Sequence, residues 1–279
     1  MTFDEVYEAV TAEPHNDSLR EQLADECRVS DPDRARFIDI QNARARTRRT
    51  TRSTMPKSSP EEERLLAAHE AAWSRTLAKY TTHRQFYRGA VESIEIDPFM
   101  FLEYGEWLFK LAPICDVSFR MAERGARFPL TAVLASPLLA KLDSVSVPDL
   151  GLGDADIEQL AACPHLARCL VLDLSYNQLS LRSFEALAAS SATRKLLFIA
   201  RDGQGANNYK PGERLRPVGD QVDRWGADVW DWSDVGDEGR DLERRYGYIP
   251  WLHYKNVCSY FDARWYVDHG ILPVVTERA

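Results

Sequence analysis

The residues before Arg44 carry three short apolar stripes separated by turn-forming residues. Apolar positions recur at helical spacing between Phe3 and Val10, over Leu19–Cys27 and over Ala35–Gln41. Asn16 or Asp17 stands where the second helix would need an N-cap. Because helices this short cannot bury an apolar face alone, we expect the three to pack on one another and on the next part of the chain.

A fourth helix is predicted after residue 58. Ser58 or Ser59 can cap it, Pro60 suits its first turn, and three glutamates follow at the end that favours negative charge. An apolar stripe runs from Leu65 to Leu77 and includes His69, which we interpret as a packed histidine. The pattern over 58–90 therefore predicts a helical N-terminal cap for the region after it.

An internal repeat dominates residues 91–202. The segment CLVLDLSYNQL (Cys169–Leu179) fits the pattern L-x-x-L-x-L-x-x-N-x-L, with Cys at the first position. Weaker copies begin at Val91, Ile114 and Leu142, so successive starts lie 23, 28 and 27 residues apart. Strand, turn and helix repeated at this period predict a short leucine-rich-repeat solenoid, with parallel strands inside and helices outside. The alternative is an ordinary α/β domain with strands spaced by chance.

The repeat pattern also assigns roles to its polar positions. Asn177 is structural, because its side-chain amide can satisfy backbone groups that the turn leaves unpaired. Small and acidic side chains at the other strand positions predict a mildly acidic concave face that suits a basic protein partner. The candidate binding residues are Glu92, Glu95, Asp116, Ser118, Ser144, Ser146, Asp173 and Ser175.

A basic segment, Arg44–Lys57, separates the first three helices from the fourth. It lacks acids and nearly lacks large apolar residues, which indicates a solvated loop. The hypotheses are an exposed linker, a phosphate-binding strip for nucleic acid, a site of regulatory proteolysis, or a loop that docks on the protein's own acidic repeats. The linker is favoured over nucleic acid because no aromatic residue interleaves the charges. The basic residues are Arg44, Arg46, Arg48, Arg49, Arg52 and Lys57.

The segment 203–279 does not continue the repeat, and it is rich in acidic and aromatic residues. It is predicted to be an irregular cap over the last repeat, since every solenoid end needs one. The alternative is a partner-binding hot spot that includes Trp230 and Trp232. A calcium loop starting at Asp231 is rejected because its fifth and twelfth positions, Val235 and Leu242, cannot be side-chain ligands.

Several stretches together resemble bacterial proteins in which a repeat-companion domain, a short helical module, precedes leucine-rich repeats. The resemblance covers about residues 3–200 and departs from the family at Gln22–Cys27, where such modules usually read Tyr-Ala-Asp-Trp-Leu-Glu. It implies a binding surface on the repeats and supplies no catalytic residues. The matching stretches are Val10–Ala24, Asp31–Gln41, LLAAHEAAW (65–73), FYRGAVESIEI (86–96), LFKLAPI (108–114) and CPHLARCLVLDLSYNQL (163–179).

Composition changes this picture only at its margins. The 279 residues carry 35 basic and 43 acidic side chains, a net charge of −8, which argues against a generally basic nucleic-acid binder. Residues 1–90 sum to zero, whereas 91–209 carry −5 and 210–279 carry −3. The acidity therefore lies on the repeats and the C-terminal segment, opposite in sign to the basic loop.

Candidate chemistry is sparse. The five cysteines form no CxxC, and the cluster Cys163, His165 and Cys169 is a weak zinc candidate, so no metal or cofactor is expected. No common catalytic or phosphate-binding motif occurs, and the set His253, Cys258 and Asp262 is no better than chance. Without a signal sequence or a membrane-spanning stretch, we expect a cytoplasmic chain with no membrane partner.

Together these patterns predict an α/β protein in four parts: a helical module (1–57), a helical cap (58–90), leucine-rich repeats (91–202) and a C-terminal cap (203–279). The expected function is a non-catalytic scaffold or regulatory subunit that binds a protein through the repeats and the C-terminal aromatic region. The alternatives are a switch operated by cleavage between Arg44 and Lys57, and nucleic-acid association through that loop.

Overall fold

The computed structural model describes residues 2–47, 57–123, 125–200, 236–252 and 259–270. Its N-terminal part is a cluster of three helices, α1 (Phe3–Ala12), α2 (Asp17–Ser30) and α3 (Pro32–Arg46), followed by α4 (Pro60–Trp73) and a short turn η1 (Leu77–Lys79). The caps are those that the sequence predicts, because Asn16 accepts from two backbone amides of α2 and Ser59 accepts from the Glu62 amide of α4. A small core of Val6, Val10, Leu23 and Ile38 joins α1 to α3.

A six-stranded sheet comes next, and its spatial order is the order of the chain, β1 to β6. Strands β1 (His83–Tyr87) and β2 (Ala90–Ile96) form an antiparallel hairpin, and β3 (Asp116–Phe119), β4 (Ser144–Ser146), β5 (Val171–Asp173) and β6 (Phe198–Ala200) continue in parallel. Gly89 makes the hairpin turn at a φ of +85°, and a Cβ there would lie 2.2 Å from Ile38 Cγ1. Glycine is therefore required both by the turn and by its contact with α3.

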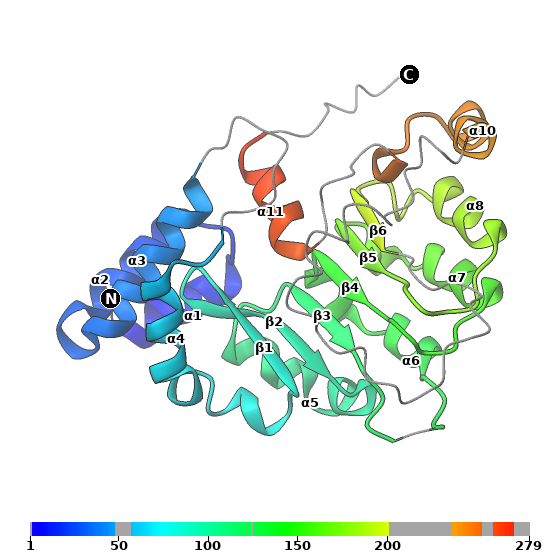
Figure 1. The fold of residues 1–279 in the computed structure, drawn as a ribbon. Coiled ribbons are helices and arrows are strands. Elements are labelled where there is room, and N and C mark those ends of the chain that lie inside the picture. The colour runs from blue at the N-terminus through cyan, green and yellow to red at the C-terminus, as the bar shows by residue number, and fades with distance from the viewer. Residues whose placement is uncertain (1, 48–56, 124, 201–235, 253–258, 271–279) are drawn as a thin grey trace.

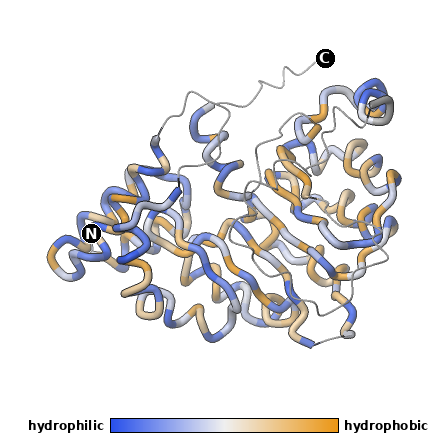
Figure 2. Tube along the Cα trace, in the orientation of Figure 1, coloured by the Kyte–Doolittle hydropathy of each residue, from blue (hydrophilic) through white to orange (hydrophobic). Residues whose placement is uncertain are grey.

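Helices cover one face of the sheet (Figure 1). These are α5 (Pro98–Leu111), α6 (Leu130–Leu134), α7 (Asp154–Ala161) and α8 (Leu181–Ala189), with the short turns η2 (Pro137–Lys141) and η3 (Pro164–Leu166) before β4 and β5. Alternate strand residues, among them Val117, Val145 and Leu172, point into a core shared with these helices. Figure 2 shows hydrophobic positions along the strands and the inward sides of the helices.

The C-terminal segment does two different things. Helix α10 (Gly236–Tyr246) packs against α8, and the turn η5 (Pro250–Leu252) packs against β6, so that Leu242, Trp251 and Leu252 extend the main core past the last strand. Helix α11 (Tyr260–Asp268) instead lies on the opposite face of the sheet from α5–α8 (Figure 1). There its Ala263 and Tyr266 join a separate cluster with Val171 of β5.

Three predicted boundaries need correction. Residues 58–90 are not wholly helical, because His83–Tyr87 is an edge strand whose polar sequence conceals the strand pattern. The basic loop does not begin at Arg44, since α3 continues to Arg46. The described part of 203–279 is helical rather than irregular. No helix among the residues that the structure describes is long and apolar enough to cross a membrane.

Candidate functional site

The face of the sheet opposite α5–α8 carries a row of small polar side chains, which we call the serine–aspartate face. The register places Ser93, Asp116 and Ser144 side by side, and Ser118, Ser146 and Asp173 form the next row. Further along the first row, Val171 and Phe198 are apolar and lie under α11. The polar part of this face therefore lies beside the part that α11 covers.

The two aspartates of this face have hydrogen bonds but no cation. Ser93 Oγ donates to Asp116 Oδ2 at 2.6 Å, and the Ser175 amide donates to Asp173 Oδ1 at 2.9 Å. Among the residues that the structure describes, no arginine, lysine or histidine forms an ion pair with either aspartate. Burial raises the pKa of Asp116 to about 6, although Ser93 and Ser144 oppose the rise, and burial also raises the pKa of Asp173. Both carboxylates would gain from a cation brought by a partner.

The remaining predicted binding residues are less accessible than the sequence suggests. Asp116, Ser118, Ser146 and Asp173 are partly exposed, whereas Ser144 and Ser175 are buried. Glu95 is partly exposed, but Arg120 Nη1 lies 3.4 Å from its Oε1. The prediction is wrong for Glu92, whose side chain has no exposed surface and forms an ion pair with Arg20 inside the protein. Glu92 directly precedes Ser93 in β2, a strand in which every residue except Glu95 is buried.

Glu92 is the centre of a buried polar cluster, which we call the polar lock. Arg20 Nη2 of α2 donates to Glu92 Oε1 at 2.5 Å, and Tyr260 Oη of α11 donates to Glu92 Oε2 at 2.7 Å. Arg88 lies beside them, with Nη1 2.8 Å from Asp17 Oδ1. The polar lock thus joins the helical module, the sheet and the C-terminal helix through residues that are far apart in the sequence.

Helix α11 makes further contacts with the first helices. Trp265 Nε1 donates to the carbonyl oxygen of Thr47 at 3.1 Å, and His269 Nε2 lies 3.3 Å from that of Arg46. Trp265 and Tyr260 are both almost fully buried. The aromatic residues of α11 therefore bind the two ends of the chain together, in addition to the capping that α10 and η5 provide.

One cluster of possible metal ligands joins His15, between α1 and α2, to Cys115 and Asp143, which directly precede β3 and β4. Ligand atoms of His15, Cys115 and Asp143 lie within 4.8 Å of one another. Arg168 Nη2 lies 2.6 Å from Asp143 Oδ1, and Arg264 Nη1 lies 3.9 Å from its other oxygen, so positive charge already surrounds the position that a metal cation would take. Such surroundings disfavour a cation.

The same group does not resemble an activated nucleophile either. Cys115 has no exposed surface, its Sγ donates to the Pro113 carbonyl, and burial raises the pKa of the thiol well above its usual range. Nucleophilic catalysis needs the thiolate and an approach for substrate. We therefore interpret His15 and Asp143, whose Nε2 and Oδ2 atoms are 2.7 Å apart, as a contact between the helical module and the sheet.

The basic loop is partly accounted for by the protein itself. Arg44 Nη2 lies 2.7 Å from Glu62 Oε1, and Arg46 Nη2 lies 2.7 Å from Glu21 Oε1. Lys57 is exposed. Arg48, Arg49 and Arg52 lie outside the described residues, as do Trp230 and Trp232 of the predicted C-terminal hot spot. Cleavage and nucleic-acid binding in this loop stay predictions.

Asn177 has the structural role that the repeat pattern predicts. Its Oδ1 accepts from the amides of Leu150 and Leu152 at 3.1 and 3.0 Å, and its Nδ2 donates to the carbonyl oxygen of Val147 at 2.8 Å. One side chain therefore fixes the loop of the preceding strand as well as its own turn.

Sequence reasoning missed Arg20 and Tyr260. Arg20 had a detectable signal, because it lies at helical spacing from Ala24 and Cys27, on the apolar side of α2. A charge at such a position indicates a buried partner. Tyr260 had no comparable signal, since only the tertiary fold brings it to Glu92, 168 positions away.

In comparisons with known proteins, no family model, no curated protein and no solved structure matches this chain.

Proposed function

We propose that this protein is a non-catalytic scaffold or regulatory subunit that binds a basic segment of a protein partner on its serine–aspartate face. The observation that carries the proposal is the state of Asp116 and Asp173, two carboxylates with raised pKa and no cation among the described residues. A lysine or arginine from a partner would supply the missing charge in a partly desolvated place, where an ion pair is stronger than in bulk water.

We also infer that the sheet and its helices are a short leucine-rich-repeat solenoid behind a repeat-companion-like module. In support, the repeat copies that start at Val91, Ile114, Leu142 and Cys169 coincide with strands β2 to β5, and these strands pair in chain order and in parallel. In such a solenoid the serine–aspartate face is the concave one, the usual binding surface of these proteins. A crystal structure in which the sheet is flat or closed would contradict this interpretation.

The serine–aspartate face can be tested by affinity capture of partners from lysate of the native host. The double variant Asp116→Asn/Asp173→Asn removes both carboxylates but keeps side chains of the same shape. The control Glu8→Gln/Glu106→Gln removes the same charge from exposed helix positions on α1 and α5. We expect a partner with a basic segment to bind the wild type and the control, and to be lost from the double variant. Equal capture by all three proteins would contradict the proposed binding face.

A further inference from the structure

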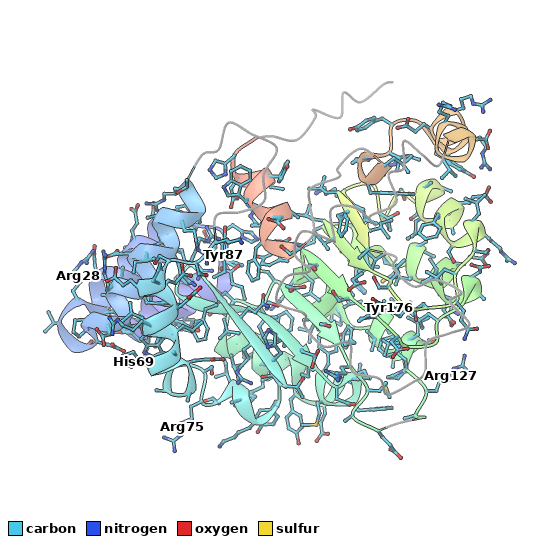
Figure 3. All side chains as sticks on the ribbon, viewed as in Figure 1. Arg28, His69, Arg75, Tyr87, Arg127 and Tyr176 are labelled. Atoms are coloured by element: carbon cyan, nitrogen blue, oxygen red, sulfur yellow. The ribbon has the colours of Figure 1, made fainter. Side chains whose placement is uncertain are left out.

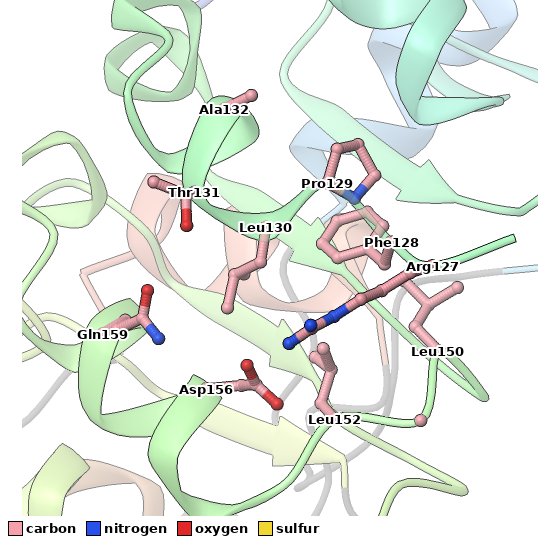
Figure 4. A pocket seen from close by; sticks show the side chains of 11 residues that line it. Arg127, Phe128, Pro129, Leu130, Thr131, Ala132, Leu150, Leu152, Asp156 and Gln159 are labelled. Atoms are coloured by element: carbon pink, nitrogen blue, oxygen red, sulfur yellow. The ribbon is translucent and has the colours of Figure 1, made fainter.

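A cavity of about 440 Å³ opens on another part of the molecule, where the loops after β3 and β4 meet α6 and α7 (Figure 4). Its walls include Arg127, Phe128, Leu130, Leu152, Asp156 and Gln159. The position is at the carboxyl ends of two parallel strands, which is where open α/β sheets commonly bind ligands. The volume falls in the range of about 300–1,000 Å³ that is typical of small-molecule sites.

Two opposite charges line this cavity without neutralising each other. Figure 4 shows the side chains of Arg127 and Asp156 directed toward the same space from two different elements. Among the described residues, Arg127 forms no ion pair, with Asp156 or with any other carboxylate. One oxygen of Asp156 accepts from the Gly153 amide at 2.9 Å, which leaves the other oxygen for a ligand. Leu130 and Leu152, which belong to the main core, also line the cavity and give it an apolar wall.

The loop that forms one wall is held in a fixed shape. Asp149 and Gly151 have φ angles of +53° and +67°, in the left-handed region. The Asn177 side chain holds this conformation by accepting from the amides of Leu150 and Leu152. A wall fixed in this way lowers the conformational cost of binding, because the loop is already ordered.

We propose that this cavity binds a small zwitterion with apolar side chains, of the size of a dipeptide. The ligand carboxylate would pair with the Arg127 guanidinium, which can donate two parallel hydrogen bonds. The ligand ammonium would pair with Asp156, beside the Gln159 amide, and the apolar side chains would lie on Leu130 and Leu152. A ligand with only one charge would leave the opposite charge of the cavity without a partner. The proposal does not depend on the serine–aspartate face.

Isothermal titration calorimetry of the full chain with the dipeptide Leu-Leu tests the proposal. We expect saturable binding to the wild type, and at least tenfold weaker binding to Arg127→Gln and to Asp156→Asn. Asn at position 156 keeps an oxygen that can accept from the Gly153 amide, so that the N-terminus of α7 stays capped.

Matched controls are Arg75→Gln and Asp4→Asn. Arg75 is exposed and lies far from Arg127 on the surface (Figure 3), and Asp4 stands in the first turn of α1 as Asp156 does in α7. Both controls should bind Leu-Leu as the wild type does.

A second titration uses Leu-Leu with an acetylated N-terminus and an amidated C-terminus, which carries neither charge. The blocked peptide should bind at least tenfold more weakly than Leu-Leu. The proposal is overturned if Leu-Leu shows no saturable binding to the wild type, if the blocked peptide binds equally well, or if Arg127→Gln and Asp156→Asn both retain full affinity. Thermal unfolding of each variant shows whether the fold is kept.

Discussion

The polar lock and the serine–aspartate face lie on the same sheet, and they use charge in opposite ways. In the polar lock, Glu92 receives a hydrogen bond on each oxygen from Arg20 and Tyr260, and no part of its side chain is exposed. On the serine–aspartate face, Asp116 and Asp173 are hydrogen-bonded by serines and have no cation among the described residues. The paired charges hold three parts of the chain together, whereas we propose that the unpaired ones bind a basic segment of a partner. Removing each kind of charge in turn tests this difference.

The largest effect is expected when one member of the polar lock is removed. Arg20→Met leaves Glu92 buried without its main cationic partner, which costs about 3–5 kcal/mol in the free energy of unfolding. Chemical denaturation followed by circular dichroism measures this loss. Arg28→Met is the control, because Arg28, labelled in Figure 3, makes an ion pair at the exposed surface. The denaturation midpoint of this variant should stay near that of the wild type. Equal midpoints for the two variants would show that the polar lock does not hold the fold together.

Two tyrosines near α11 should respond differently to the loss of a hydroxyl group. Tyr260→Phe removes the donor to Glu92 Oε2 and leaves that oxygen without a partner, at a cost of about 1–3 kcal/mol. The Tyr87 hydroxyl is buried and has no hydrogen-bond partner among the described residues, so that Tyr87→Phe should be neutral or stabilising. Thermal unfolding of both variants gives the comparison, and a larger loss for Tyr87→Phe than for Tyr260→Phe would contradict it.

A smaller effect on stability is expected from pH, with opposite signs at Asp116 of β3 and at Asp143, which directly precedes β4. Asp116 binds its proton more tightly in the folded chain than in the unfolded one. Its stabilising contribution is therefore complete below pH 3.8 and is lost as the pH rises through about 6. Because Asp116 is partly exposed, we expect only about 0.5–1 kcal/mol between pH 7 and pH 5.

Asp143 behaves in the opposite way. Burial alone would raise its pKa, but His15 and Arg168 hold the pKa below its usual value. Its contribution is present above pH 3.8 and is lost as the pH falls through the lowered folded-state pKa. Unfolding at several pH values, compared between the wild type and Asp116→Asn, isolates the Asp116 part. If stability changes equally in both proteins between pH 7 and pH 5, then Asp116 has no raised pKa.

Sequence reasoning located the strands better than the contacts between distant elements. The L-x-L positions of each copy could be found because strand side chains alternate, and Asn177 stood out because the repeat pattern requires an amide there. The polar strand β1 escaped detection because an edge strand need not alternate, and its His83–Gln85 half faces solvent.

The sites divide in the same way. Asp116 and Asp173 were found because strand parity is visible in the sequence, whereas the burial of Glu92 depends on Arg20 and Tyr260, 72 and 168 positions away. The cavity beside Arg127 and Asp156 also forms only when two loops meet. Such contacts arise from the tertiary fold, and they cannot be predicted from the spacing of residues along the sequence.

The most direct test of the serine–aspartate face is a titration of isotope-labelled protein with a short lysine-rich peptide, followed by amide chemical shifts. We expect saturable shifts concentrated at residues 116–118, 144–146 and 171–173, with affinity at least tenfold weaker for Asp116→Asn/Asp173→Asn than for Glu8→Gln/Glu106→Gln, which has the same net charge. Shifts spread over the acidic surface, with equal affinity in the two double variants, would contradict the account.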